Sequence, residues 1–277
     1  AQYLSISTNA DASLVLVATR ERQNGTDQPN WGKLFSVGPE GQVRPFLIRN
    51  RDDTPGYTNP YDLQSARFSP GGHWLAVMGA AECRLGSSGL CQNGDFNRTT
   101  VYDTTGTERF FVPGTVVMSP NGRWLASTTR EVVGFRIRLW DAPQFTSREI
   151  LSLSGNLSAT AVRDDGAVLV SIYGRGTVLY PPSGGPVRVV PEGTYVMMSA
   201  DGTRFAVQQG THVLLQAPDG TTRDLGEGSL RAFSYSGDVV LFLRGGQLWS
   251  SYGQVTNEAS GIELAELSGD GKWVIYT

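Results

Sequence analysis

A short phrase recurs along the whole sequence: a small residue, a turn residue, a Gly, and then an alternating apolar run. The clearest copies are 69–77 (Ser-Pro-Gly-Gly-His-Trp-Leu-Ala-Val) and 119–127 (Ser-Pro-Asn-Gly-Arg-Trp-Leu-Ala-Ser). Weaker copies begin at Arg163, Ser199, Ser234 and Ser268, and a degenerate copy begins at Thr8. The last copies are spaced by about 35 residues, and the earlier ones by that unit plus insertions. A recurrence of this kind indicates a repeat architecture.

Each repeat is expected to contain four strands, which we name A to D. Strand A precedes the anchor, as at 63–68 and 195–198, and strand B follows it. Asn-Gly and Asp-Gly at the anchor are strong signals of a hairpin turn between two strands. Strand C is short and often aromatic, at 33–36, 100–103, 137–141, 178–180, 213–215 and 247–249. A polar Gly/Pro turn then leads to a short outer strand D.

One such unit cannot bury both of its faces, but units packed side by side in a closed ring can. We therefore predict that 1–277 is a single all-β domain, a β-propeller of four-stranded blades. The sequence supplies seven A–B pairs and only six C–D pairs, which predicts seven blades with an incomplete last blade. The missing strands would come from a longer chain, of which this is a fragment, or from another chain. A six-bladed ring with the last pair as an appendage is the alternative.

The copies at Ser69, Ser119 and Ser199 fit the phrase Ser-Pro-(Asp/Asn/Gly)-Gly-x-x-Leu-Ala best, and Trp140-Asp141 matches the Trp-Asp dipeptide of WD repeats. The phrase resembles the repeat of TolB-type, WD-repeat-like propellers. This resemblance covers nearly the whole chain and implies the propeller fold. It implies little about function, because such propellers serve many tasks.

Insertions at 19–32, 49–62, 79–98 and 128–135 are predicted to be B–C and D–A loops on one face of the first three repeats. Function on repeat scaffolds is usually carried by such loops, and Tyr, Trp and Arg anchor interfaces. The predicted recognition surface consists of Arg20, Arg22, Trp31, Arg49, Arg51, Asp52, Asp53, Tyr57, Tyr61, Arg84, Asp95 and Arg130. Tolerated surface insertions are the alternative interpretation.

Catalytic chemistry is not indicated. Neither His73 nor His212 is marked for a triad, and the sequence has no Gly-x-Ser-x-Gly elbow. No cofactor is expected. Calcium bound at 93–97 or at Asp52-Asp53 is the weaker alternative, because neither segment matches the ligand pattern of a calcium loop. We predict a non-catalytic, protein-binding scaffold. The alternatives are a gating or substrate-binding domain of an enzyme, a ligand- or carbohydrate-binding propeller, and a subunit that self-assembles through its last strand edge.

Cys83 and Cys91 flank a Gly/Ser-rich loop and are predicted to form a disulfide, with two free thiols as the alternative. A disulfide predicts export to the periplasm, the cell surface or the exterior. The net charge is −3 without a basic stripe, which argues against nucleic acid as a partner. No apolar run approaches the roughly 20 residues that span a bilayer. Trp74, Trp124 and Trp273 occupy equivalent B-strand positions and are predicted to pack as a repeat.

Overall fold

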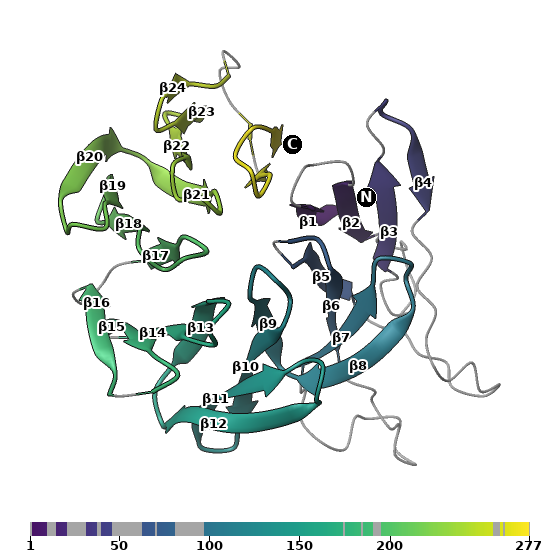
Figure 1. Cartoon of the computed structure of the whole chain (residues 1–277). Coiled ribbons are helices and arrows are strands. Elements are labelled where there is room, and N and C mark those ends of the chain that lie inside the picture. Colours follow the sequence, from purple (N-terminus) through teal and green to yellow (C-terminus); the bar gives the residue numbers. More distant parts are fainter. Residues whose placement is uncertain are drawn as a thin grey trace.

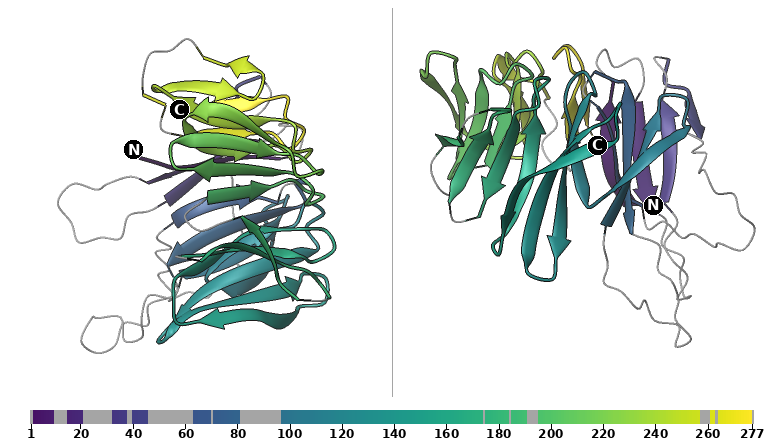
Figure 2. Two further views of the ribbon diagram at one scale, coloured as in Figure 1. Left: turned by 90° about the vertical axis from the view of Figure 1, so that its left-hand side faces the viewer. Right: turned by 60° about the horizontal axis from the view of Figure 1, so that its bottom comes forward.

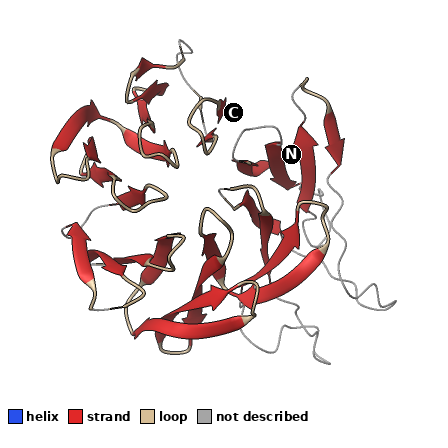
Figure 3. Cartoon of the chain, viewed as in Figure 1, coloured by secondary structure: helices blue, strands red, loops and turns tan. Residues whose placement is uncertain are grey.

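The sheets of the computed structural model surround a common axis (Figure 1). It describes residues 2–9, 15–20, 32–37, 40–45, 63–69, 71–80, 97–173, 175–183, 185–190, 195–256, 261–262 and 264–276. All regular elements in these ranges are strands (Figure 3). Consecutive strands within each sheet pair antiparallel, so the connections between strands lie on two opposite faces of the ring (Figure 2).

The described residues form six complete four-stranded blades. Blade 1 contains β1 (Gln2–Thr8), β2 (Val15–Arg20), β3 (Gly32–Val37) and β4 (Val43–Pro45). Blade 2 contains β5 (Leu63–Phe68), β6 (Trp74–Ala80), β7 (Asn97–Asp103) and β8 (Glu108–Pro113). Blade 3 contains β9 (Thr115–Met118), β10 (Trp124–Glu131), β11 (Gly134–Asp141) and β12 (Thr146–Leu153).

The other three blades are built in the same way. Blade 4 contains β13 (Leu157–Val162), β14 (Val168–Ile172), β15 (Gly176–Tyr180) and β16 (Val187–Val190). Blade 5 contains β17 (Tyr195–Met198), β18 (Phe205–Gln209), β19 (His212–Gln216) and β20 (Thr222–Glu227). Blade 6 contains β21 (Ser229–Phe233), β22 (Val240–Arg244), β23 (Gln247–Ser250) and β24 (Gly253–Gln254).

The prediction of seven blades is wrong, and the six-bladed alternative is correct. The last copy of the repeat forms only a two-stranded hairpin, β25 (Ala265–Leu267) with β26 (Val274–Tyr276). This hairpin lies between β21 and β1 and completes the inner part of the ring (Figure 1). Counting anchor turns overestimates the number of blades, because a turn specifies an A–B pair while a blade also needs strands C and D.

The recurring phrase folds into the same turn in all six copies that the structure describes. The turn glycine has φ between 69° and 85°, a region that L side chains rarely adopt. Its N–H donates to the carbonyl of the residue three positions earlier, at 2.7–3.0 Å. The anchor serines Ser69, Ser119, Ser199, Ser234 and Ser268 are buried, and each hydroxyl accepts the N–H of the fifth residue onward at 3.0 Å. The serine therefore satisfies a backbone donor that the hairpin would otherwise bury unpaired.

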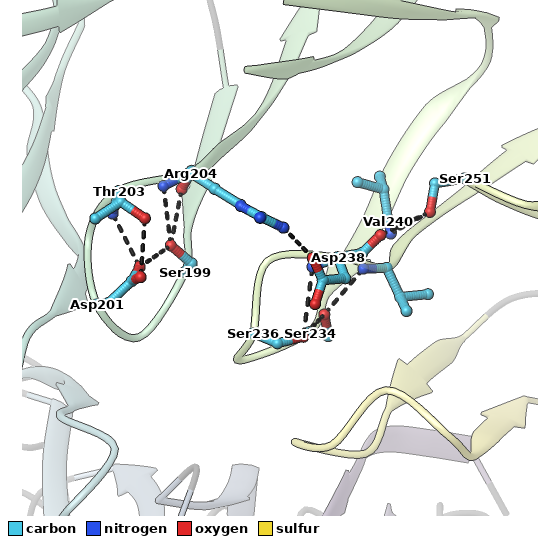
Figure 4. Close-up of polar contacts among 10 residues, drawn as sticks. Ser199, Asp201, Thr203, Arg204, Ser234, Ser236, Asp238, Val240 and Ser251 are labelled. Carbon is cyan, nitrogen blue, oxygen red and sulfur yellow. Dashed lines mark hydrogen bonds and ion pairs between the residues drawn. The ribbon is translucent and has the colours of Figure 1, made fainter. Parts of the chain in front are cut away.

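These turns also bind one another around the ring. Gly71 N–H donates to the Pro120 carbonyl at 2.8 Å, and Tyr235 N–H donates to the Gly269 carbonyl at 3.0 Å. Figure 4 shows the neighbouring turns of blades 5 and 6, where the Arg204 guanidinium forms an ion pair with the Asp238 carboxylate. The same phrase thus makes a local turn and a contact between blades.

Apolar side chains from the B and C strands fill the space between neighbouring blades. Leu125 on strand B and Ile137 on strand C of blade 3, and Val168 on strand B of blade 4, are fully buried. Trp74 and Trp124 are half-buried and pack against these cores, as predicted for a packing repeat. Trp273, the equivalent residue directly before β26, is 59% exposed and departs from the pattern.

Two glycines allow the effects of backbone strain and of packing on stability to be measured separately. Gly122 and Gly220 have φ of 71° and 83°; a Cβ on Gly122 would clash with the Trp74 ring, whereas one on Gly220 would meet no atom within 4 Å. Gly220→Ala should lower the free energy of unfolding by about 1–2 kcal/mol through backbone strain alone. Gly122→Ala should lower it by about a further 1–3 kcal/mol through overpacking.

Urea unfolding measures both losses, and a Trp74→Ala background should remove the extra loss of Gly122→Ala. Equal losses for the two alanine variants would show that contact between the blades does not constrain the turn.

Candidate functional site

Most of the predicted recognition surface lies outside the described residues, which leaves it untested. This holds for Arg22, Trp31, Arg49, Arg51, Asp52, Asp53, Tyr57, Tyr61, Arg84 and Asp95, and for the predicted disulfide of Cys83 with Cys91. Arg20 is the last residue of β2, and Arg130 is exposed on β10 in blade 3. The segment 128–135, predicted as a loop, is mostly strand: β10 and β11 pair up to Glu131 and Gly134, and only Val132 and Val133 form the turn.

The two histidines lie in different blades. His73 is exposed beside the anchor turn of blade 2. In blade 5, His212 Nδ1 lies 2.9 Å from Asp224 Oδ2, and both side chains are about half exposed. Gly226 N–H and His212 lower the pKa of Asp224, which favours its charged form. The two side chains form an exposed hydrogen-bonded pair.

The described residues contain neither a metal-binding cluster nor a membrane-spanning helix. No three His, Cys, Asp or Glu side chains in these ranges gather as a metal site requires. No helix in the same ranges is long and apolar enough to cross a membrane.

A groove with a volume of about 710 Å³ lies between blades 5 and 6. It opens among the B–C turns β18–β19 and β22–β23 and the D–A connection from β20 to β21. Function was predicted on this face, but on blades 1–3. The lining residues are Tyr195, Gln208, Gly210, Thr211, Glu227, Gly228, Ser229, Leu230, Leu243, Arg244 and Gly245.

The Gln208 side chain holds the two blades together at the groove. Its Oε1 accepts Leu230 N–H at 2.6 Å, and its Nε2 donates to the carbonyls of Gly210 and Gly228 at 2.9 and 3.0 Å. Gly228 fits only because it lacks a side chain: a Cβ there would lie 2.7 Å from the Phe242 ring. One amide side chain and one glycine therefore fix the connection from β20 to β21.

Arg244 of blade 6 donates hydrogen bonds to the backbone of blade 5. Its Nε donates to the Glu227 carbonyl at 2.8 Å, and its terminal nitrogen donates to the Leu225 carbonyl. The guanidinium lies 4.7 Å from the ring centroid of Trp249 and 5.1 Å from that of Phe242, within cation–π range. These contacts hold the Arg244 guanidinium against backbone carbonyls, and the groove is also lined by Glu227, whose side chain is exposed.

The lining combines a phenol, a carboxylate, two hydroxyls and two leucines. Tyr195, Glu227, Thr211 and Ser229 supply the polar groups. The volume is in the range of small-molecule sites, which pair apolar walls with a few polar groups. Sequence reasoning missed the groove because it forms between ordinary repeat turns, without any insertion.

Tyr195 connects the groove with a second group of polar side chains, which we call the axial cluster: Arg67, Tyr195, Tyr235 and Glu266. They come from β5, β17, the turn after β21, and β25, around the axis of the ring (Figure 1). Burial raises the pKa of Tyr195, the Arg67 charge lowers this pKa and the Glu266 charge raises it. Tyr195 nevertheless keeps 48% of its surface accessible.

Glu266 and Tyr235 are the strongly perturbed members of the axial cluster. Burial raises the pKa of Glu266 to about 7, against the opposing effect of the Arg67 charge. Burial also raises the pKa of Tyr235, assisted by the charges of Asp164 and Glu266. The Tyr235 hydroxyl is buried and has no hydrogen-bond partner among the described residues. Perturbed groups of this kind are concentrated at functional sites, although structural networks also produce them.

Comparisons with known proteins identify the fold. No protein-family model matches the sequence, and none of the curated proteins compared with it matches. TolB from Acinetobacter baumannii is 18% identical over 96% of this chain, with a TM-score of 0.57, and this chain spans 63% of that one. An oligogalacturonate lyase in complex with manganese is 15% identical over all of this chain and 85% of its own, with a TM-score of 0.61.

A third neighbour is the β-propeller domain of the Trilobed protease from Pyrococcus furiosus, which has an open velcro topology. It is 13% identical over 99% of this chain and 88% of its own, with a TM-score of 0.63. At these identities the likeness shows the fold alone. It confirms the resemblance to TolB-like propellers at that level.

The raised pKa of Glu266 predicts how stability depends on pH. Between its ordinary value near 4.5 and its folded value near 7, unfolded Glu266 loses a proton that folded Glu266 keeps. Stability from this group is therefore full below about pH 4.5 and is lost as the pH rises to about 7. Glu266→Gln, which mimics the protonated form, should flatten this decline and gain on the order of 2 kcal/mol at pH 8.

Denaturant unfolding of both proteins from pH 4.5 to 8 measures the effect. The matched control is Glu227→Gln, an exposed glutamate that should leave the profile unchanged. A wild-type profile parallel to that of Glu266→Gln would contradict the raised pKa of Glu266.

Proposed function

We propose that the chain is a non-catalytic, ligand-binding propeller module that takes a hydroxylated, amine-bearing small molecule, such as an amino sugar, in the groove between blades 5 and 6. The carrying observation is the groove itself, which is lined by Glu227, Tyr195, Thr211 and Ser229 between two blades joined by the hydrogen bonds of Gln208 and Arg244. Hydroxyl groups of a sugar match the hydroxyls of Thr211 and Ser229, and its apolar face matches Tyr195 and the leucines.

The negative charge of Glu227 favours a ligand that carries an amine. Glu227 is exposed, while Arg244 is committed to backbone carbonyls. A cationic amine on the ligand would gain a charge-assisted hydrogen bond to Glu227, whereas a sugar acid would meet repulsion. The oligogalacturonate lyase is a fold-level precedent for a propeller associated with a carbohydrate.

The lining also supports a binding role over hydrolysis. Glycoside hydrolysis ordinarily uses two carboxyl groups that flank the scissile bond. Among the described lining residues Glu227 is the carboxylate, and Tyr195, Thr211 and Ser229 are the other polar side chains that carry a proton on oxygen. The groove therefore fits recognition, and any catalytic step would need groups from elsewhere.

Calorimetric titration with three disaccharides tests this proposal: the dimer of glucosamine, cellobiose and digalacturonate. The glucosamine dimer should bind most tightly and digalacturonate least. Glu227→Gln should weaken the glucosamine dimer by about tenfold, the value of one charge-assisted hydrogen bond, and leave cellobiose nearly unchanged. Tyr195→Phe should weaken both.

The matched control is Glu40→Gln, the same substitution at an exposed position between β3 and β4. The proposal fails if no disaccharide gives saturable binding, or if neither groove substitution changes the affinity. Hydrolysis of a disaccharide during the titration would overturn the non-catalytic part alone.

A further inference from the structure

Two charged residues occupy equivalent positions on the inner strands of the ring. Arg67 of β5 and Glu266 of β25 each lie two residues before an anchor serine, and their cross-strand neighbours, Ala76 and Ile275, are equivalent residues of strand B. β1 contacts both β5 and β25, so one inner strand separates the two. The equivalent residues of the other repeats are all apolar: Ile6, Val117, Ala161, Met197 and Ala232. The two charges are therefore departures from the repeat pattern.

Both charged side chains keep accessible surface although they lie on innermost strands (Figure 1). Arg67 is exposed and Glu266 is half-buried. Because neighbouring repeats cover the two faces of an inner strand, accessible surface on such a strand borders the space around the axis. Within the described residues, neither side chain has a hydrogen-bond or ion-pair partner, and the two do not pair with each other. Two opposite charges without partners therefore border this space.

Two phenols flank the level of Arg67 and Glu266 along the axis. Tyr195 lies four residues before its anchor serine and Tyr235 lies one residue after its own, toward opposite ends of the inner strands. Tyr195 is 48% exposed, whereas the Tyr235 hydroxyl is buried and has no hydrogen-bond partner among the described residues. A buried hydroxyl without a partner is costly, and a ligand that bonds to it would remove that cost.

Glu266 is the carboxylate that the axial cluster offers to a ligand. Asp164 also acts on Tyr235 through its charge, but Asp164 Oδ1 already accepts the N–H of Asn121 at 2.8 Å. Burial raises the pKa of Glu266 to about 7, and no hydrogen bond within the described residues stabilises its charged form. An ammonium group would supply both the opposite charge and the hydrogen bonds that this carboxylate lacks.

We propose that the space around the axis binds a zwitterionic α-amino acid, whose carboxylate pairs with the Arg67 guanidinium and whose ammonium pairs with the Glu266 carboxylate. The planar guanidinium fork matches a carboxylate, and the tyrosine rings attract an ammonium through cation–π interaction. A ligand with a single charge would leave one of the two protein charges without a partner. This site does not rest on the function proposed for the groove between blades 5 and 6, although Tyr195 belongs to both.

Calorimetric titration at pH 8, where Glu266 is mostly charged, tests the site with three matched compounds. These are phenylalanine, phenethylamine, which lacks the carboxylate, and phenylpropanoate, which lacks the amine. Phenylalanine should show saturable binding, and each analogue should bind about tenfold more weakly, the value of one charge-assisted hydrogen bond. Arg67→Gln should weaken phenylalanine by a similar factor and leave phenethylamine unchanged. Glu266→Gln should weaken phenylalanine in the same way and leave phenylpropanoate unchanged.

The matched controls are Arg148→Gln on the outer strand β12 and Glu40→Gln between β3 and β4, which should leave the affinity for phenylalanine unchanged. Urea unfolding checks that each variant folds, and the comparison of the three compounds on the unchanged protein needs no variant. Glu227→Gln separates this site from the groove, because it should leave phenylalanine binding intact whether or not the groove binds a disaccharide.

The proposal is overturned if phenylalanine shows no saturable binding, or if the three compounds bind with equal affinity. It is also overturned if Arg67→Gln and Glu266→Gln leave the affinity for phenylalanine unchanged, or if Glu227→Gln weakens phenylalanine while Glu266→Gln does not. The last result would place the amino acid in the groove.

Discussion

The hydrogen bond from a backbone N–H to the buried hydroxyl of the anchor serine is the interaction on which the ring depends. It appears five times with the same 3.0 Å distance, in the turns that begin at Ser69, Ser119, Ser199, Ser234 and Ser268. Because it closes the hairpin without water, the turn can be buried against its neighbour. The turn glycine then packs on the preceding blade, as Gly122 does on Trp74. A local bond and a contact between blades thus stabilise each other.

These two contacts of the anchor turn explain how two strands, β25 and β26, can complete the inner part of the ring. An anchor turn and its A–B pair are enough to meet the neighbours on both sides, as Tyr235 N–H does by donating to Gly269. Strands C and D contribute cover for the B strand instead. The β25–β26 hairpin therefore completes the inner part of the ring with two strands, which contact β21 and β1.

Most of the fold could be predicted from the repeat. The A strands 63–68 and 195–198 match β5 and β17, because the hairpin signal fixes where each strand ends. The blade number could not be obtained in this way, because the number of anchor turns differs from the number of complete four-stranded sheets. The axial cluster could have been predicted from the sequence, since Arg67 and Glu266 each lie two residues before an anchor serine. The groove was not, because it depends on how Gln208 reaches across to Leu230 and Gly228, and neither repeat period nor residue type encodes that distance.

The sites arise where single copies depart from the common pattern. Four residues before the anchor serine, blades 2 and 3 carry the small residues Ser65 and Thr115, whereas blade 5 carries Tyr195. This one substitution puts a phenol where the groove and the axial cluster meet, within the field of both Arg67 and Glu266. Since Glu266 changes charge near pH 7, the surroundings of Tyr195 change with it. A regular scaffold therefore supplies rigidity, and its irregular positions supply the chemistry.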